Sequence, residues 1–291
     1  MSSLSLITAR YRPLLDKSEE PFFVCHYIFD DRFFTFSLAV HRRLYITFVF
    51  TTFQFVAFLD IAEREGSSLE NELTHNFGAL RAKFIKCDIS DEQQLTEAYR
   101  HVLYKFSRLD GVINNAAVLR NDEHYAKMIG TNFTATVSST MKAIDILSTE
   151  KGGKGGAIVN VASQLALQPT SHLPVYGATK TAVFHFSSSI AAFFQAQQEK
   201  TGVRVITICL GPTDTAILER QNLKNFDNDS KTLTSRVSVR QRVESAANGI
   251  MDAIKNGDGG SIWVVADDKP AVNVTTIVAK GYQLLSESLE T

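Results

Sequence analysis

Short apolar runs alternate with longer amphipathic stretches along most of this chain, and that alternation limits its fold more than any other feature. The runs, rich in valine and isoleucine, occupy residues 55–59, 82–87, 111–113, 157–161, 203–209 and 261–265. Nearly continuous apolar runs of this length are typical of strands covered on both faces. Residues 92–106, 125–147 and 176–198 are predicted to be helices. The alternation predicts a single-domain α/β fold with a Rossmann-like, doubly wound parallel sheet.

The first 54 residues differ in composition from the rest. Residues 1–60 contain 11 of the 20 phenylalanines, and the first of the 16 glycines is Gly66. We therefore divide the chain into an atypical, Phe-rich, Gly-free segment, residues 1–54, and an α/β domain, residues 55–291.

Charge and cysteine content exclude several classes of protein. Lys and Arg number 30 against 31 Asp and Glu, a net charge of −1, and no basic tract is present, so we expect neither nucleic acid nor a membrane as partner. The three cysteines show no C-x-x-C spacing, which excludes a disulfide framework and a cysteine-rich zinc site. No secretory signal begins the chain. We predict a cytoplasmic protein without a bound metal.

The predicted strands end in residues suited to a binding site. In a doubly wound sheet, ligands bind beyond the carboxyl ends of the strands. The residues that fall there are Asp60, Asp88, Asn115, Ser163 and Gly211. Each alone is explained equally well as a capping or turn residue. Their shared position predicts a site along one edge of the sheet.

Ser163, Tyr176 and Lys180 form the strongest chemical signal. Tyr176 and Lys180 are four residues apart, so on a helix they share a face. A Lys ammonium beside a phenol favours the phenolate and lowers its pKa from about 10. Tyr176 is then a candidate general acid/base, and Ser163 a candidate hydrogen-bond partner of a substrate oxygen. The alternative is an exposed helical pair without a catalytic role.

At these motifs the chain resembles the short-chain dehydrogenase/reductase family. The Asn-Asn-Ala-Ala sequence at residues 114–117 is similar to that family's Asn-Asn-Ala-Gly element, and Asn132 matches its helix asparagine. Residues 174–180 and 208–218 are similar to the 15-hydroxyprostaglandin dehydrogenase group and its insect alcohol dehydrogenase-like relatives. The resemblance covers roughly residues 55–263.

The resemblance implies an NAD-dependent oxidoreductase that interconverts a secondary alcohol and a ketone by hydride transfer. It implies a catalytic tetrad in which Tyr176 exchanges the hydroxyl proton and Lys180 lowers its pKa and binds the nicotinamide ribose. Ser163 would hold the reacting oxygen, and Asn132 would support a water path towards Lys180. The implied cofactor-binding residues are Asp60, Ile61, Asp88, Ile89, Asn115, Tyr176, Lys180, Thr213, Asp214 and Thr215.

Two positions bear on specificity. Asp60, at the end of the second strand, can accept hydrogen bonds from the adenosine ribose and repels a 2′-phosphate, which favours NAD over NADP. Leu173, a predicted substrate contact beside Ser163 and Tyr176, stands where the prostaglandin group has a glutamine, which argues against a prostaglandin substrate. The resemblance also implies a homodimer or homotetramer formed through the two long helices.

The family's glycine-rich phosphate-binding turn is missing. It is expected near residues 30–45, where the chain has no glycine, although only glycine lets the backbone approach a pyrophosphate so closely. Three explanations are open. Residues 1–54 are not the native product of the gene; or the chain is a cofactor-deficient pseudoenzyme that acts as a dimerisation or interaction subunit; or residues 44–59 are a membrane anchor, for which sixteen residues are short.

Overall fold

The structure, a computed structural model, describes residues 22–26, 55–78, 81–119, 124–169, 173–195, 201–218 and 240–288. Its centre is an eight-stranded sheet of order β3-β2-β1-β4-β5-β6-β7-β8, parallel except for the last strand. The strands are β1 (Phe22–His26), β2 (Phe55–Asp60), β3 (Ala82–Lys86), β4 (Gly111–Asn114), β5 (Gly156–Val161), β6 (Val203–Leu210), β7 (Ile262–Val265) and β8 (Val272–Asn273). The predicted doubly wound α/β fold is confirmed, and each predicted strand is correct to within one residue at either end.

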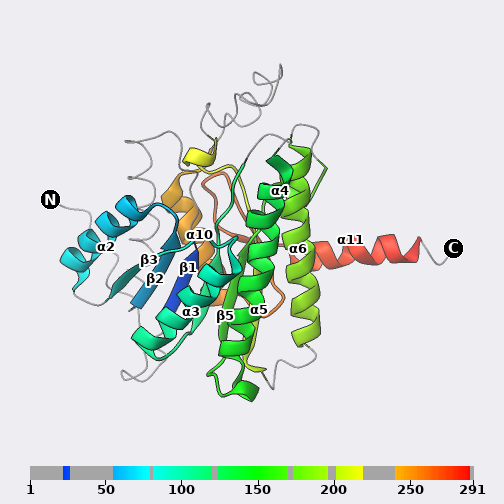
Figure 1. The fold of residues 1–291 in the computed structure, drawn as a ribbon. Helices are drawn as coiled ribbons and strands as arrows, with labels where there is room; N and C mark the ends of the chain where they lie inside the picture. Colours follow the sequence, from blue (N-terminus) through cyan, green and yellow to red (C-terminus); the bar gives the residue numbers. More distant parts are fainter. Residues whose placement is uncertain are drawn as a thin grey trace.

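Helices cover both faces of the sheet (Figure 1). One face carries α2 (Glu63–Phe77) and α10 (Val243–Asn256), and the other carries α3 (Glu92–Phe106), α5 (Ala135–Leu147) and α6 (Pro174–Gln195). Each layer encloses its own apolar core: Leu73 and Ile250 are buried in the first, Leu95 and Leu147 in the second. The strands β2, β4, β5 and β6 are buried almost throughout, which explains their nearly continuous apolar sequences.

The helix predicted over residues 125–147 is continuous but not uniform. It comprises α4 (Tyr125–Met128), a π-helical turn, η2 (Ile129–Thr134), and α5. A π turn inside an α-helix is rare and often coincides with a functional site. Apolar periodicity gave no sign of it, because one extra residue in a turn changes the helical period only locally.

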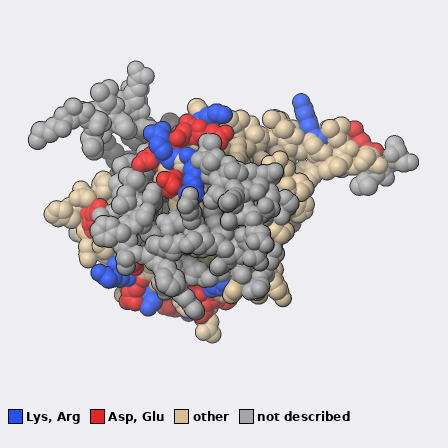
Figure 2. Space-filling view, turned by 90° about the horizontal axis from the view of Figure 1, so that it is seen from above, with Lys and Arg blue, Asp and Glu red and all other residues tan. Residues whose placement is uncertain are grey.

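The remaining elements are short, except for the last helix. Three 3₁₀ turns, η3 (Thr149–Lys151), η4 (Gln164–Ala166) and η5 (Ala216–Leu218), follow α5, β5 and β6. After β8, α11 (Thr275–Glu287) projects from the body of the molecule, as Figure 1 shows. Lys and Arg side chains lie among Asp and Glu on the described surface in Figure 2, without separate patches of one sign.

The compositionally foreign N-terminal segment contributes β1 to the middle of the sheet. β1 lies between β2 and β4, with His26 paired to Leu59 and Asn114. β1 ends at His26, before the range 30–45 in which the glycine-rich turn was expected. Residues 27–54 lie outside the described residues, and the division of the chain at residue 54 remains a prediction.

The expected membrane anchor over residues 44–59 overlaps the sheet. Residues 55–59 belong to the buried strand β2, and residues 44–54 lie outside the described part of the chain. Among the helices that the structure describes, none combines the length and apolar character needed to cross a bilayer.

Candidate active site

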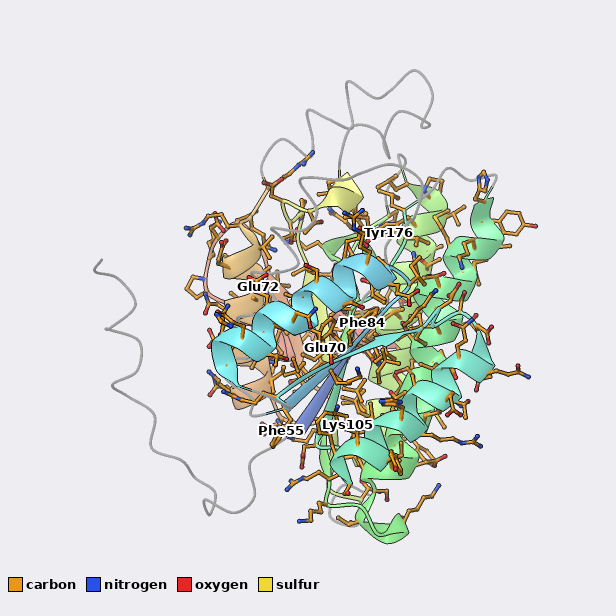
Figure 3. All side chains as sticks on the ribbon, turned by 60° about the vertical axis from the view of Figure 1, so that its left-hand side comes forward. Phe55, Glu70, Glu72, Phe84, Lys105 and Tyr176 are labelled. Atoms are coloured by element: carbon orange, nitrogen blue, oxygen red, sulfur yellow. The ribbon has the colours of Figure 1, made fainter. Side chains whose placement is uncertain are left out.

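The predicted site residues gather at the carboxyl edge of the sheet. The strand order reverses between β1 and β4, which is where a doubly wound sheet opens a crevice for ligands. Asp60 ends β2, and Asn115 and Ser163 follow β4 and β5. Tyr176 lies towards the opposite end of the sheet from Phe55, the first residue of β2 (Figure 3). These residues therefore share one edge of the sheet, as their positions in the sequence predicted.

Lys180 connects α6 to the sheet. Its side chain is 3% exposed, and its Nζ donates a hydrogen bond to the Val161 carbonyl oxygen at 2.9 Å. Val161 is the last residue of β5, two residues before Ser163. The same Nζ lies 5.9 Å from the centre of the Tyr176 ring, within reach of a cation–π attraction. Tyr176 and Lys180 thus share one face of α6, as their spacing predicted.

In this structure, burial outweighs the expected effect of Lys180 on the pKa of Tyr176. Burial raises the pKa of the Tyr176 phenol above its usual value, and burial lowers the pKa of Lys180 to about 8. Desolvation disfavours the charged form of both groups, and the ammonium is directed at Val161. At neutral pH Tyr176 is therefore a neutral phenol, the form that donates a proton.

An apolar cluster accounts for the burial of Tyr176. Its members besides Tyr176 are Leu119, Leu165, Leu173, Ile217 and Leu218, which come from four separate loops or turns. Leu173 was predicted as a substrate contact, whereas the other four were missed. No periodic pattern marks an apolar residue in a loop, although Ile217 and Leu218 directly follow the predicted cofactor segment. We call this group the Leu119–Leu173 cluster.

Ser163 is placed by the turn that follows β5. It caps η4, and its Oγ accepts a hydrogen bond from the Leu165 N–H at 3.2 Å. A serine hydroxyl carries one hydrogen and two lone pairs, so Ser163 retains its own hydrogen for a substrate oxygen. Since η4 packs against α6, Ser163 lies on the same side of the sheet as Tyr176.

Asn132 lies in the π turn and makes a different set of contacts from the one expected. Its Oδ1 accepts from the Val118 N–H at 2.8 Å, and its Nδ2 donates to the Val118 carbonyl at 2.9 Å and to Thr179 Oγ1 at 3.1 Å. Thr179 in turn donates to the Tyr176 carbonyl at 2.8 Å. Both N–H groups of Asn132 are thus committed to holding α6 against the loop after β4. The water path towards Lys180 remains a prediction.

Acidic residues lie where the adenosine end of a dinucleotide is expected. Asp60 is 3% exposed, and its Oδ1 accepts from the Ala62 N–H at 2.9 Å. Burial opposes ionisation of Asp88, but hydrogen bonds from Ser90 and Lys127 outweigh it and hold the Asp88 pKa below its usual value. The side chain of Ile89 is buried in the core, and that of Ile61 packs partly against it.

The segment predicted to contact the nicotinamide, residues 213–215, is compact. Thr213 is buried, and its Oγ1 donates to the Gly211 carbonyl at 3.0 Å. The hydroxyl of Thr215 donates to the Thr213 carbonyl at 3.4 Å, and the exposed Asp214 pairs with Arg240 at 3.4 Å. Asn115, which directly follows β4, is half-buried.

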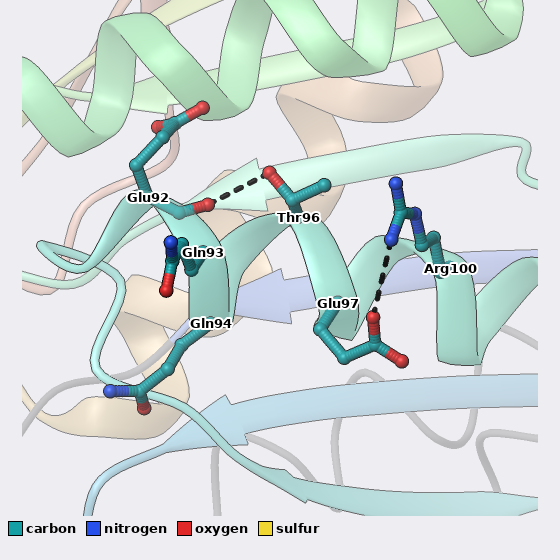
Figure 4. Close-up of a pocket in the computed structure, with 6 residues that line it drawn as sticks. All are labelled: Glu92, Gln93, Gln94, Thr96, Glu97 and Arg100. Carbon is teal, nitrogen blue, oxygen red and sulfur yellow. Dashed lines mark hydrogen bonds and ion pairs between the residues drawn. The ribbon is translucent and has the colours of Figure 1, made fainter.

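Elsewhere, the described residues offer no competing centre. A shallow hollow on α3 is lined by Glu92, Gln93, Gln94, Thr96, Glu97 and Arg100 (Figure 4). It contains none of the predicted site residues, and Glu97 and Arg100 pair with each other across it. Within the described ranges no three His, Cys, Asp or Glu side chains gather as metal ligands.

Comparison with known proteins gives consistent results. A family model described as short chain dehydrogenase matches residues 47–225. Human 15-hydroxyprostaglandin dehydrogenase (NAD+) is 37% identical over 215 residues, which cover 73% of this chain and 77% of that protein. Alcohol dehydrogenase 1 of Ceratitis capitata is 31% identical over 183 residues, 62% of this chain and 70% of that protein.

Solved structures share the fold. Levodione reductase aligns with a TM-score of 0.68 at 15% identity, over 85% of this chain and 96% of that one. The 3-ketoacyl-(acyl-carrier-protein) reductase of Brucella melitensis, complexed with NADH, gives 0.66 at 19% identity, over 85% and 97%.

Proposed function

This chain belongs to the short chain dehydrogenase family, and from that premise we propose that it is an NAD-dependent oxidoreductase that interconverts an apolar secondary alcohol and its ketone. The observation that carries the proposal is the placement of Tyr176 and Lys180 on one face of α6, tied to β5 just before Ser163. The names of two relatives, a 15-hydroxyprostaglandin dehydrogenase (NAD+) and an alcohol dehydrogenase, support the same reaction class.

The residues at both ends of the site suit NAD. The buried Asp60 carboxylate offers acceptors to the adenosine ribose hydroxyls and would repel a 2′-phosphate. The residues that would hold the adenosine are Asp60, Ile61, Asp88 and Ile89, and those that would hold the nicotinamide end are Asn115, Tyr176, Lys180, Thr213, Asp214 and Thr215. The pyrophosphate would lie beyond His26, where the chain is free of glycine.

The chain's own residues supply the proton chemistry. Bound NAD supplies hydride transfer to or from the reacting carbon. In ketone reduction, Tyr176 donates its phenolic proton to the substrate oxygen and becomes a phenolate, and in alcohol oxidation the proton returns along the same path. Ser163 donates a hydrogen bond to that oxygen, and the Lys180 ammonium stabilises the phenolate while it exists. Asn132, through Thr179, keeps α6 in register.

The Leu119–Leu173 cluster indicates the substrate class. Leucine and isoleucine side chains pack around Tyr176 and offer no hydrogen-bonding group to a substrate. Burial of apolar substrate surface against them is favourable, whereas a substrate polar group would lose its hydration there. We therefore propose that the carbons flanking the reacting carbinol are alkyl or aryl.

The direction of the Tyr176 pKa shift predicts a difference between the two reaction directions. Ketone reduction uses the neutral phenol, which a raised pKa keeps populated, so its kcat/KM stays level from pH 6 to 8. Alcohol oxidation uses the phenolate, so its kcat/KM rises about tenfold per pH unit over that range. The rise should flatten above pH 8, because Lys180, with its pKa of about 8, loses its charge there. A pH profile of both directions tests this; a level oxidation profile would contradict it.

Asp60→Asn is expected to weaken the preference for NAD. The amide keeps the Oδ1 acceptor for the Ala62 N–H but removes the charge that repels a 2′-phosphate. We expect the ratio of NADPH to NADH affinity to rise at least about tenfold, or about 1.4 kcal/mol. Nucleotide fluorescence titrations of both proteins measure it. Asp145→Asn, at an exposed pair with Lys151 and outside the predicted site, is the matched control. An unchanged ratio in Asp60→Asn would argue against the assignment.

NADH titration of the full chain tests the proposed function. Saturable binding of NADH, followed by oxidation of an apolar secondary alcohol such as 2-octanol with NAD, is the expected result. A folded chain that binds no NADH would support the alternative, a cofactor-deficient subunit. The absence of the glycine-rich turn is the observation behind that alternative.

We also propose that the protein is cytoplasmic and forms a homodimer or homotetramer through α5 and α6. Sedimentation of the same sample measures the oligomeric state.

A further inference from the structure

Gln241 forms several hydrogen bonds with the loop that follows β6. No sequence motif indicated a role for this residue. It lies two residues before α10 and is 1% exposed. Its N–H donates to the Pro212 carbonyl at 2.9 Å, and its carbonyl accepts from the Asp214 N–H at 2.9 Å. These two bonds flank Thr213, with which Gln241 forms an isolated parallel bridge.

The Gln241 side chain continues the same connection. Its Nε2 donates to Thr213 Oγ1 and to the carbonyl of Val265, the last residue of β7, both at 3.0 Å. A carbonyl can only accept, so the amide must direct its NH₂ group towards Val265. The Thr213 hydroxyl accepts from Gln241 and gives its own hydrogen to Gly211, which leaves that hydroxyl one orientation.

The other half of the Gln241 carboxamide is unsatisfied. Its Oε1 is buried and has no hydrogen-bond partner among the described residues. A buried acceptor without a partner costs about 1–3 kcal/mol. A leucine or methionine would fill the same space without that cost. Packing alone therefore does not explain a glutamine at this position. The two hydrogen bonds that its Nε2 donates to Thr213 and Val265 do.

The preceding residue, Arg240, strengthens the connection from outside. Its Nη2 donates to the Leu218 carbonyl at 2.7 Å, and its Nη1 lies 3.4 Å from Asp214 Oδ1. Leu218 and Arg240 are the two described residues that flank residues 219–239. Arg240 and Gln241 thus hold the two ends of that connection together beside Thr213.

We propose that Gln241 is a positioning residue for the nicotinamide end of the site. Through its backbone and its carboxamide, it fixes residues 211–215 against β7, so that Thr213 presents one orientation to the cofactor. This inference rests on the proposed function and deepens it. In hydride transfer, a misplacement of about 1 Å can cost about 10²-fold in rate. The order of this loop is therefore expected to matter more for turnover than for binding.

Gln241→Met tests the inference first without any cofactor. Methionine has a similar length and removes both N–H donors. In the ligand-free chain, we expect amide hydrogen exchange at Thr213 and Asp214 to accelerate roughly tenfold. Arg204→Met is the matched control. Arg204 lies at the start of β6, the strand that residues 211–215 follow, and its side chain also donates to backbone carbonyls, including that of Ile254 at 3.3 Å. It should leave exchange in this loop unchanged.

Steady-state kinetics of the same variants supply the second measurement. In Gln241→Met we expect kcat to fall about 10²-fold while the KM for NADH stays within about threefold. If methionine prevents folding, Thr213→Val removes the hydroxyl that Gln241 orients and should lower kcat about tenfold with the same split.

The outcomes distinguish a failure of this inference from a failure of the proposed function. Unchanged exchange in Gln241→Met overturns the inference whatever the activity, and so does faster exchange with an unchanged kcat. A folded wild-type chain that binds no NADH overturns the proposed function instead, and the exchange comparison then still decides whether Gln241 orders the loop.

Discussion

Tyr176→Phe is expected to lower kcat about 10³-fold in both reaction directions, because it removes the only atom that exchanges the substrate proton in the proposed mechanism. NADH affinity should stay within about threefold, since the ring and its contacts with the Leu119–Leu173 cluster remain. The free energy of unfolding should change little for the same reason. Initial rates, a nucleotide titration and denaturant unfolding measure the three quantities.

Tyr99→Phe is the matched control for Tyr176→Phe. The Tyr99 hydroxyl is buried under α3 and lies 2.8 Å from Ser139 Oγ, with a second bond to the Ser139 carbonyl at 3.2 Å. Removing it leaves Ser139 short of a partner and should cost about 1–2 kcal/mol of stability. Its kcat should be unchanged. If Tyr176→Phe retained turnover, or lost it only by unfolding, Tyr176 would not be the acid/base.

Lys180→Met should make the protein more stable at neutral pH while abolishing turnover. Burial lowers the Lys180 pKa from 10.5 to about 8, so at pH 7 the folded protein holds a charge that its surroundings disfavour. That shift corresponds to about 3 kcal/mol, from which about 1 kcal/mol is subtracted for the lost bond to Val161. We expect a net gain of about 2 kcal/mol in the free energy of unfolding.

The pH dependence gives this prediction its sign. A group whose folded pKa is lowered stabilises the fold above its unfolded pKa, and that contribution is lost as pH falls towards the folded pKa. The advantage of Lys180→Met should therefore be full below pH 8 and vanish towards pH 10.5. Denaturant unfolding at pH 7 and pH 10 measures it. Lys142→Met, at a half-exposed surface pair with Glu92, should change stability by less than about 1 kcal/mol. A less stable Lys180→Met at pH 7 would contradict the account.

The sheet, the helices and the shared edge of the candidate site residues could be predicted because their signals are local. The apolar run at residues 203–209 and the period over 92–106 depend only on neighbours in sequence, and the structure has β6 and α3 there. The shared face of Tyr176 and Lys180 follows from helix geometry alone. The carboxyl-edge placement of Asp60 follows from topology.

The pKa shift of Tyr176 and the role of Gln241 could not be predicted, because both depend on contacts between residues distant in sequence. The Tyr176 pKa is raised by a cluster whose members, from Leu119 to Leu218, span much of the chain. Gln241 acts on Thr213 from 28 positions away, in a stretch without a motif. The central strand β1 was hidden because the chain lacks the glycines by which a first strand is usually recognised.

The position of β1 changes how any alternative N-terminus of this protein should be judged. A chain begun at Phe55 would not simply lack a tail: β2 and β3 would separate from β4 and the strands beyond it, and each half would expose an unpaired parallel edge. Such edges recruit other chains and promote aggregation. Any alternative N-terminus must therefore supply a five-residue strand between β2 and β4. Soluble expression would report on that strand, and dinucleotide binding on the residues that follow it.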